Sequence, residues 1–290
     1  MKTHQALQTI SSGHGYLEAP RWHDGRLWAS DFFGHHVLTF DADGNQTTFA
    51  TFEESPSGLG FLEDGSVLVV LLDPAKKKIV RIASDGSVSE HADIAHVAGG
   101  MANDMLVSPT GHAYVGNFGF DILAEDPKPT NLAHVTPEGE VRRVDGDVTF
   151  PNGAALSADR RTLFLAETFG HRIDAFDVND DGSLTNFRVW AKLDESMHPD
   201  GIALDTEGGV WFGNGLTDGP ESGFYRVDET GEITDSVLVP DAWAVACTFG
   251  GPELDVLYML CNATTLEQFG QGKSDGTVRT AQVNRRGVPQ

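Results

Sequence analysis

The chain has 290 residues and is strongly acidic, because 43 Asp and Glu residues against 20 Lys and Arg residues give a formal net charge of −23 at pH 7. This charge argues against nucleic acid or an anionic membrane as a partner, since both require a basic surface. No apolar run approaches the roughly 18 residues of a membrane-spanning helix, and Met1–Gln5 lacks the apolar segment of a secretory signal. We expect a cytoplasmic protein, with Cys247 and Cys261 as buried free thiols rather than a cross-strand disulfide.

Turn signals recur along the chain at a nearly constant interval. One series, which includes Asp24-Gly25, Asp64-Gly65 and Glu207-Gly208, has spacings of 40 to 49 residues. A second series lies between them, from Asp43-Gly44 to Asp275-Gly276, with spacings of 42 to 53 residues. Such dipeptides between runs of β-branched and aromatic residues indicate β-hairpins. Two interleaved series therefore predict repeated units of four antiparallel strands.

Six such units predict an all-β fold, a six-bladed β-propeller with four antiparallel strands per blade. The chain then forms one domain over residues 1–290, with blades at 15–52, 56–96, 100–148, 150–193, 198–240 and 242–288. We expect the N-terminal strand to complete the last blade and so close the ring. The best candidate for a short helix is 193–198. Long loops at 123–131 and 264–274 are of the kind that shapes a site.

The first strand of each propeller blade lines the central channel, so residues at the heads of these strands converge. Counting back from the first series of turns places four oxygen-bearing side chains at these heads: Glu18, Asn103, Asn152 and Asp200. Two carboxylates and two amides suit a hard divalent cation, for which Ca²⁺ or Mg²⁺ fits best and Mn²⁺ or Zn²⁺ also fits. The alternative is that Asn152-Gly153 and Asp200-Gly201 are ordinary turn dipeptides.

The same residues carry a resemblance to a known family. The chain is similar to the SMP-30/gluconolactonase/luciferin-regenerating-enzyme family of six-bladed propellers through four motifs at blade spacing: Glu18-Ala19-Pro20-Arg21-Trp22, Asn103-Asp104, Pro151-Asn152-Gly153 and Pro199-Asp200-Gly201. The resemblance implies that Glu18, Asn152 and Asp200 bind one divalent metal ion, for which we expect Ca²⁺ first. It also implies catalytic roles for Asn103, which contacts substrate or a metal-bound water, and for Asp200 as general base.

The expected substrate contacts depart from the sugar-lactonase pattern. The resemblance implies contact with an acidic residue after the following strand, and Asp121 lies there. Members that open sugar lactones carry an arginine two residues before the Asn103 position, where this chain has Met101. Phe118 and Phe120 add apolar side chains at the same mouth of the channel, unless they belong to the blade core. These substitutions favour a lactone or ester that is less polar than a sugar lactone.

The predicted function is therefore metal-dependent hydrolysis of a small-molecule lactone. A bound cation polarises the carbonyl group. Either Asp200 takes a proton from the attacking water or a metal-bound hydroxide attacks directly. The alternative is a propeller that binds calcium or a small molecule without catalysis, because fold does not determine function. Metal-dependent turnover distinguishes the two.

Overall fold

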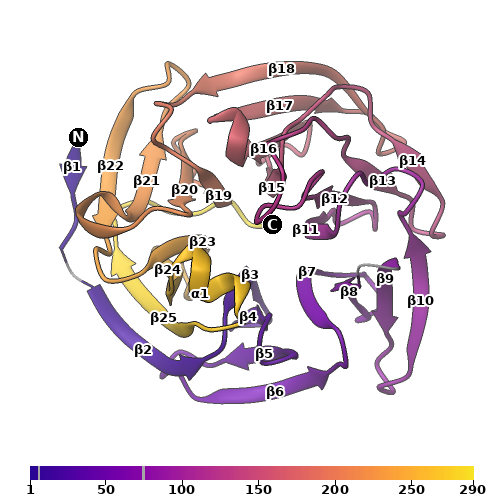
Figure 1. Ribbon diagram of the computed structural model, residues 1–290, viewed down its shortest axis with the longest axis horizontal. Helices are drawn as coiled ribbons and strands as arrows, with labels where there is room; N and C mark the ends of the chain where they lie inside the picture. The colour runs from indigo at the N-terminus through magenta and orange to yellow at the C-terminus, as the bar shows by residue number, and fades with distance from the viewer. Residues whose placement is uncertain (6, 74–75) are drawn as a thin grey trace.

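The computed structural model describes residues 1–5, 7–73 and 76–290. Among these residues, six β-sheets surround a central channel, and the four strands of each blade that follow one another from the channel outward are antiparallel (Figure 1). The six-bladed propeller is thereby confirmed.

The blades follow one another in chain order. The first two contain β3 (Leu17–His23), β4 (Arg26–Asp31), β5 (His36–Phe40) and β6 (Gln46–Thr51), then β7 (Ser55–Phe61), β8 (Val67–Leu72), β9 (Lys77–Ile82) and β10 (Val88–Asp93). The next two contain β11 (Ala102–Val107), β12 (Ala113–Asn117), β13 (Ala133–Val135) and β14 (Val141–Arg143), then β15 (Pro151–Leu156), β16 (Thr162–Glu167), β17 (Arg172–Val178) and β18 (Leu184–Lys192). The last two contain β19 (Pro199–Leu204), β20 (Val210–Asn214), β21 (Gly223–Val227) and β22 (Ile233–Leu238), then β23 (Trp243–Gly250), β24 (Val256–Ala263) and β25 (Asp275–Gln282).

The N-terminal strand closes the ring, as predicted. β2 (Leu7–His14) pairs antiparallel with β25 and is the outermost strand of the sixth blade. Because this fourth strand comes from the N-terminus, the sixth blade needs no hairpin after β25. The prediction of a turn at Asp275-Gly276 is therefore wrong, and these residues begin β25 instead. β1 (Lys2–Thr3), which was not predicted, adds a fifth strand parallel to β22 in the fifth blade.

Helical structure is sparse and lies in the loops. The predicted helix at 193–198 is wrong, since that segment has no helical residues. The helix α1 (Leu266–Gly270) lies instead in the long loop 264–274, where the Thr265 side chain caps it by accepting a hydrogen bond from the Gln268 backbone. Two single 3₁₀ turns are η1 (Thr168–Gly170) and η2 (Gly219–Glu221). No helix in the described part of the chain is long and apolar enough to cross a membrane.

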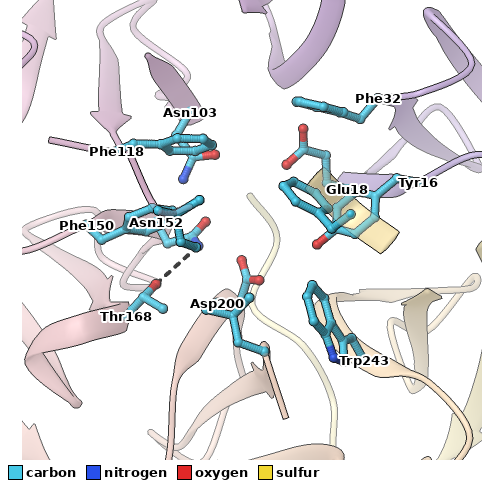
Figure 2. Close-up of a pocket in the computed structure, with 13 residues that line it drawn as sticks. Tyr16, Glu18, Phe32, Asn103, Phe118, Phe150, Asn152, Thr168, Asp200 and Trp243 are labelled. Atoms are coloured by element: carbon cyan, nitrogen blue, oxygen red, sulfur yellow. Dashed lines mark hydrogen bonds between the residues drawn. The ribbon is translucent and has the colours of Figure 1, made fainter. Parts of the chain in front are cut away.

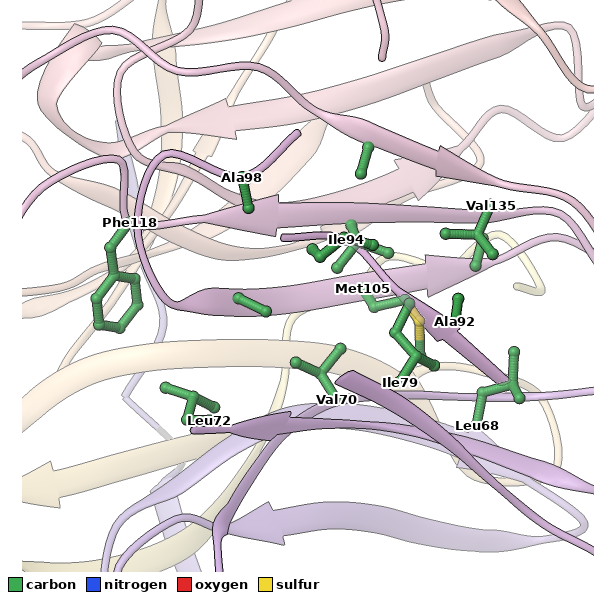
Figure 3. Packing of buried hydrophobic residues seen from close by; sticks show 14 of the residues in the cluster. Leu68, Val70, Leu72, Ile79, Ala92, Ile94, Ala98, Met105, Phe118 and Val135 are labelled. Carbon is green, nitrogen blue, oxygen red and sulfur yellow. The ribbon is translucent and has the colours of Figure 1, made fainter. Parts of the chain in front are cut away.

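Apolar side chains pack between neighbouring blades. Between the second and third blades, Val70 and Ile79 are fully buried against Met105 and Val135 (Figure 3). Phe118 lies at the edge of the same cluster, next to the channel mouth. This packing holds the inner strands of adjacent blades at fixed positions, which any site shared between blades requires.

The C-terminal segment covers the end of the channel opposite the strand heads (Figure 1). Gly287 forms a β-bridge with Asp205, and the Val288 backbone donates to the Leu204 carbonyl over 2.9 Å. The side chain of Gln290 bonds both backbone groups of Leu156. Leu156 and Leu204 are the last residues of their inner strands. The strand heads are therefore reached from the other mouth.

A buried ion pair on the fifth blade yields a stability prediction. The carboxylate of Asp205 accepts hydrogen bonds from the Gly209 backbone, the Trp211 indole and the Arg226 guanidinium, and both charged side chains are buried. Arg226→Met leaves this carboxylate without its counter-charge, so we expect a loss of about 3–5 kcal/mol in the free energy of unfolding by urea denaturation. Arg142→Met, which breaks an exposed pair with Glu140, should cost less than about 1 kcal/mol. Equal losses would contradict the prediction.

The two cysteines are free and buried, as expected. The strand register places Cys247 opposite Met259 and Cys261 opposite Ala244, so the thiols do not face each other across β23 and β24. Burial raises the pKa of the Cys261 thiol to about 12. These thiols therefore act as small apolar core groups.

Candidate functional site

Each predicted donor lies at an irregularity in its inner strand. The register between the first and second strands shifts in all six blades, and in the four that carry the donors the shifts lie at Glu18/Arg21, Ala102/Met105, Pro151/Ala154 and Pro199/Ile202. A β-bulge bends the strand and turns a side chain away from the regular alternation. This distortion lets Glu18, Asn103, Asn152 and Asp200 point toward the channel axis, where Figure 2 shows them around a common centre.

Glycines beside two of the donors allow the inner strands to approach closely. A Cβ atom on Gly153 would lie 2.6 Å from the Cα of Gly201, and one on Gly201 would lie 2.2 Å from the Cβ of Ala246. Both glycines lie within strands, in β15 and β19. The interpretation of Asn152-Gly153 and Asp200-Gly201 as turn dipeptides is therefore wrong. The glycines are required by the spacing between blades.

The four donors line a cavity of about 50 Å³ at the channel mouth. Its other walls are mainly apolar, and six of the side chains that form them are Tyr16, Phe32, Phe118, Phe150, Trp243 and Phe269. Asn103 and Asn152 are buried, and Glu18 and Asp200 are half-buried. The four polar donors thus share the cavity with mainly apolar walls, an arrangement typical of small-molecule sites.

Glu18 and Asp200 are in an environment that disfavours their charge. The surrounding protein removes water, and this desolvation raises the pKa of each carboxyl group well above its usual range. The nearby carboxylate of Asp104 raises both pKa values further. Glu18 Oε1 and Asn103 Nδ2 have no hydrogen-bond partner. The carboxylates of Glu18 and Asp200 thus have too little positive charge around them, and one of their oxygens has no hydrogen-bond partner. This arrangement fits a divalent cation, which would balance both negative charges.

The chemistry of the donor set indicates which ion it suits. Among the described residues, no group of three or more His, Cys, Asp or Glu side chains could hold a metal ion. The converging set instead contains two carboxylates and two amides, from Glu18, Asp200, Asn103 and Asn152. Oxygen ligands of this mixed kind are preferred by hard cations such as Ca²⁺ and Mg²⁺.

A largely buried ion pair lies beside the donors, and it was not predicted from the sequence. Arg21 Nη2 lies 2.8 Å from Asp104 Oδ1 and donates to the Met105 carbonyl over 2.6 Å. Arg21 lowers the pKa of Glu18 and so opposes the effect of Asp104. Both residues stand inside the motifs that carry the family resemblance, but their pairing across blades one and three appears only in three dimensions.

A second missed feature anchors the strand heads. In four blades a buried oxygen-bearing side chain ends the second strand and accepts a hydrogen bond from the backbone just before the inner strand. The pairs of acceptor and donor are Asp31 with Gly15, Asn117 with Gly100, Glu167 with Thr149 and Asn214 with His198, at 2.8 to 3.3 Å. The signal in the sequence is a polar residue that ends an otherwise apolar second strand. These bonds fix where each donor enters the channel.

The predicted substrate contacts separate into two groups. Phe118 lines the cavity. Phe120 packs behind it, against Phe150. Met101 is half-buried against the hydrophobic cluster, and Asp121 is exposed and accepts a hydrogen bond from the backbone two residues on. The structure therefore brings Phe118 to the donors and places Met101, Phe120 and Asp121 outside the cavity lining.

The aromatic wall of the cavity includes Tyr16 and Phe269, to which no role was assigned from the sequence. Tyr16 precedes Glu18 by two residues, Trp243 begins the inner strand of the sixth blade, and Phe269 belongs to α1. Tyr16 and Phe269 contact each other edge to face, with ring centroids 5.1 Å apart. The indole of Trp243 donates to Asp218. The loop helix α1 thus completes the apolar wall.

Comparison with known proteins agrees with this architecture. The family model described as SMP-30/gluconolactonase/LRE-like region matches residues 17–263. Regucalcin of Gallus gallus is 25% identical over 94% of this chain and 92% of its own length, and a 6-deoxy-6-sulfogluconolactonase of Pseudomonas putida is 25% identical over 92% and 91%. The crystal structure of a calcium-binding protein, regucalcin of Agrobacterium tumefaciens, superposes with a TM-score of 0.77 at 19% identity, covering 100% of this chain and 99% of the other. The chain belongs to the SMP-30/gluconolactonase/LRE-like family.

Proposed function

We propose that this protein is a divalent-metal-dependent lactonase whose substrate is less polar than a sugar lactone. The observation that carries the proposal is the convergence of four oxygen donors, with Glu18 Oε1 and Asn103 Nδ2 unpaired, in an apolar-walled cavity. Membership of a family that includes a relative named as a sulfogluconolactonase supports ring opening of a lactone. The description of a structural relative as calcium-binding agrees with Ca²⁺ as the first candidate, and Mg²⁺, Mn²⁺ and Zn²⁺ are alternatives.

The residues divide between metal binding and catalysis. Glu18, Asn152 and Asp200 would hold the cation through oxygen atoms. When bound, the cation supplies Lewis-acid polarisation of the lactone carbonyl. Asn103 orients the substrate or the attacking water through its free amide group. Asp200 takes the proton of that water as it adds to the carbonyl carbon.

The walls determine which lactones bind well. Phe32, Phe118 and Phe150 present no hydrogen-bonding group to a ligand. A hydroxyl group that leaves water without gaining a partner costs about 1–3 kcal/mol, whereas each buried methylene gains about 0.8 kcal/mol. A lactone with an alkyl or aromatic substituent is therefore favoured over a polyhydroxylated ring. The half-buried Met101 supplies no charge at the position where sugar lactonases carry arginine.

The test is ring opening followed by pH-stat on matched lactones in the presence of each candidate cation. We expect kcat/KM for an alkyl-substituted or aromatic lactone to exceed that for a hydroxylated lactone of equal ring size by at least about tenfold. Chelator-treated protein is the control and should be inactive until one cation is restored. Absence of turnover with every lactone and cation would refute the proposal and favour a non-catalytic propeller that binds calcium or a small molecule.

A further inference from the structure

We propose that Thr168 is a positioning residue, which fixes the side-chain amide of Asn152 so that its oxygen faces the cation site. This inference rests on the proposed metal site. The Asn152 amide nitrogen donates to Thr168 Oγ1 over 3.2 Å, and Thr168 Oγ1 donates to the Pro199 carbonyl over 2.9 Å. Figure 2 shows the Asn152 nitrogen directed at Thr168 and its oxygen on the opposite side.

The direction of these two bonds follows from the groups that make them. A threonine hydroxyl has one proton to donate, and a backbone carbonyl can only accept. The Thr168 proton is therefore committed to the Pro199 carbonyl, and Thr168 Oγ1 can only accept from Asn152. An amide presents its NH₂ group to an acceptor, so the Asn152 oxygen must lie at the other end. The bond to the Pro199 carbonyl thus favours this orientation of the Asn152 amide over the flipped one.

This orientation matters because the two ends of an asparagine amide have nearly the same shape but opposite polarity. An oxygen directed at the centre is a cation ligand, whereas an NH₂ group would present positive partial charge to a dication. Asn103 is an internal comparison, since its amide nitrogen has no hydrogen-bond partner. The structure therefore preorganises Asn152 as a ligand and leaves Asn103 able to donate or accept.

Thr168 also occupies a fixed position between β15, which carries Asn152, and β19, which carries Asp200. It is buried, and it opens the 3₁₀ turn η1 immediately after β16. Its backbone donates to the Phe150 carbonyl over 3.2 Å, next to the start of β15. Its hydroxyl reaches Pro199, which directly precedes Asp200. One residue thus links the strand heads that carry Asn152 and Asp200.

The experiment measures cation affinity rather than activity. Wild-type protein, Thr168→Val and Thr168→Ser are stripped with chelator and titrated with Ca²⁺ and Mn²⁺ by calorimetry. Loss of a residue that orients a metal ligand typically weakens binding about 10- to 100-fold, and we expect this for Thr168→Val, which keeps the shape but removes the hydroxyl. Thr168→Ser keeps the hydroxyl and should bind within about threefold of wild type. Thr248→Val, on the part of β23 remote from the donors, is the matched control and should not change affinity.

A double-mutant cycle makes the test specific to amide orientation. In Asn152→Asp the two side-chain oxygens are equivalent, so orientation no longer decides which atom faces the cation. Thr168→Val should then change affinity much less when combined with Asn152→Asp than in the wild-type background. If the valine variant does not fold, as judged by circular dichroism, Thr168→Ala provides the same comparison without a methyl group against the Pro199 carbonyl.

The outcomes separate this inference from the proposed function. Wild-type affinity in Thr168→Val, or an equal loss in Thr168→Ser, would overturn the role of Thr168 and leave the metal site intact. An equal effect of Thr168→Val in both backgrounds would also overturn it. Failure of the wild-type protein to bind any divalent cation in the same titration would overturn the metal site and the inference together.

Discussion

Asp200→Asn is expected to reduce lactone turnover by about 10³-fold or more while the propeller remains folded. The amide has the shape of the carboxylate but cannot take a proton from the attacking water, and positioned general bases contribute about 10²–10⁴-fold. Folding should be preserved, because burial and Asp104 already disfavour the charge on Asp200 in the metal-free protein. The variant is compared with wild type by pH-stat at saturating cation, with the cation Kd measured separately by calorimetry.

The design distinguishes loss of a base from loss of a ligand. If Asp200 served only to hold the cation, a concentration that saturates the variant would restore turnover, and this result would contradict its role as base. Asp194→Asn is the control, since this exposed carboxylate accepts hydrogen bonds within its own turn and lies outside the cavity. It should retain wild-type kcat/KM. Near-normal turnover in Asp200→Asn without added cation would refute the proposed mechanism itself.

The propeller fold was predictable because the sequence signals that indicate it, the turn dipeptides, are local and recur in each blade. Turn dipeptides such as Asp24-Gly25 and Asp43-Gly44 adopt left-handed backbone at their glycines, with φ of 72° and 83°, which few other residues tolerate. Six repetitions at one period then leave little choice of fold. The exceptions are non-local. The pairing of β1 with β22 and the start of β25 at Asp275 both depend on where the N-terminal segment lies.

The residues at the heads of the inner strands were also predictable, because residues at equivalent positions in the blades of a propeller lie close together around the channel. Glu18, Asn103, Asn152 and Asp200 meet for this reason. The register shifts beside these side chains recur at the same place in all six blades, so they belong to the repeat and do not by themselves mark the donors.

The side chains around the donors could not be predicted by comparing equivalent positions in the six blades. The Arg21–Asp104 pair spans the first and third blades, and the bond from Asn152 to Thr168 joins a strand head to the end of the neighbouring strand. Phe118 and Phe120 differ by only two residues, yet only Phe118 lines the cavity. Loop residues lack the alternation that assigns strand residues to a face, so their placement requires the three-dimensional structure.

Removal of the divalent cation is expected to abolish turnover and to make the stability of the protein fall as pH rises. In the metal-free protein the pKa values of Glu18 and Asp200 are raised above their usual 4.5 and 3.8. The folded state then binds protons more tightly than the unfolded state, so this contribution to stability is fully present below about pH 4 and is lost as pH rises toward the raised pKa values. A bound dication reverses this preference by stabilising the charged carboxylates.

The difference in Tm between cation-loaded and chelated protein should therefore widen as pH is raised from about 5 to about 8 in calorimetric scans. Binding alone adds about 2.7 kcal/mol when the free cation is at about 100 times its Kd, which corresponds to several degrees in a domain of this size. The double variant Glu18→Gln, Asp200→Asn is the control for other titrating groups, such as the histidines, and should show neither the cation effect nor this part of the pH dependence. A Tm of the chelated wild-type protein that tracks the loaded protein at every pH would mean that no divalent cation neutralises these carboxylates. Both the metal site and the mechanism built on it would then be wrong.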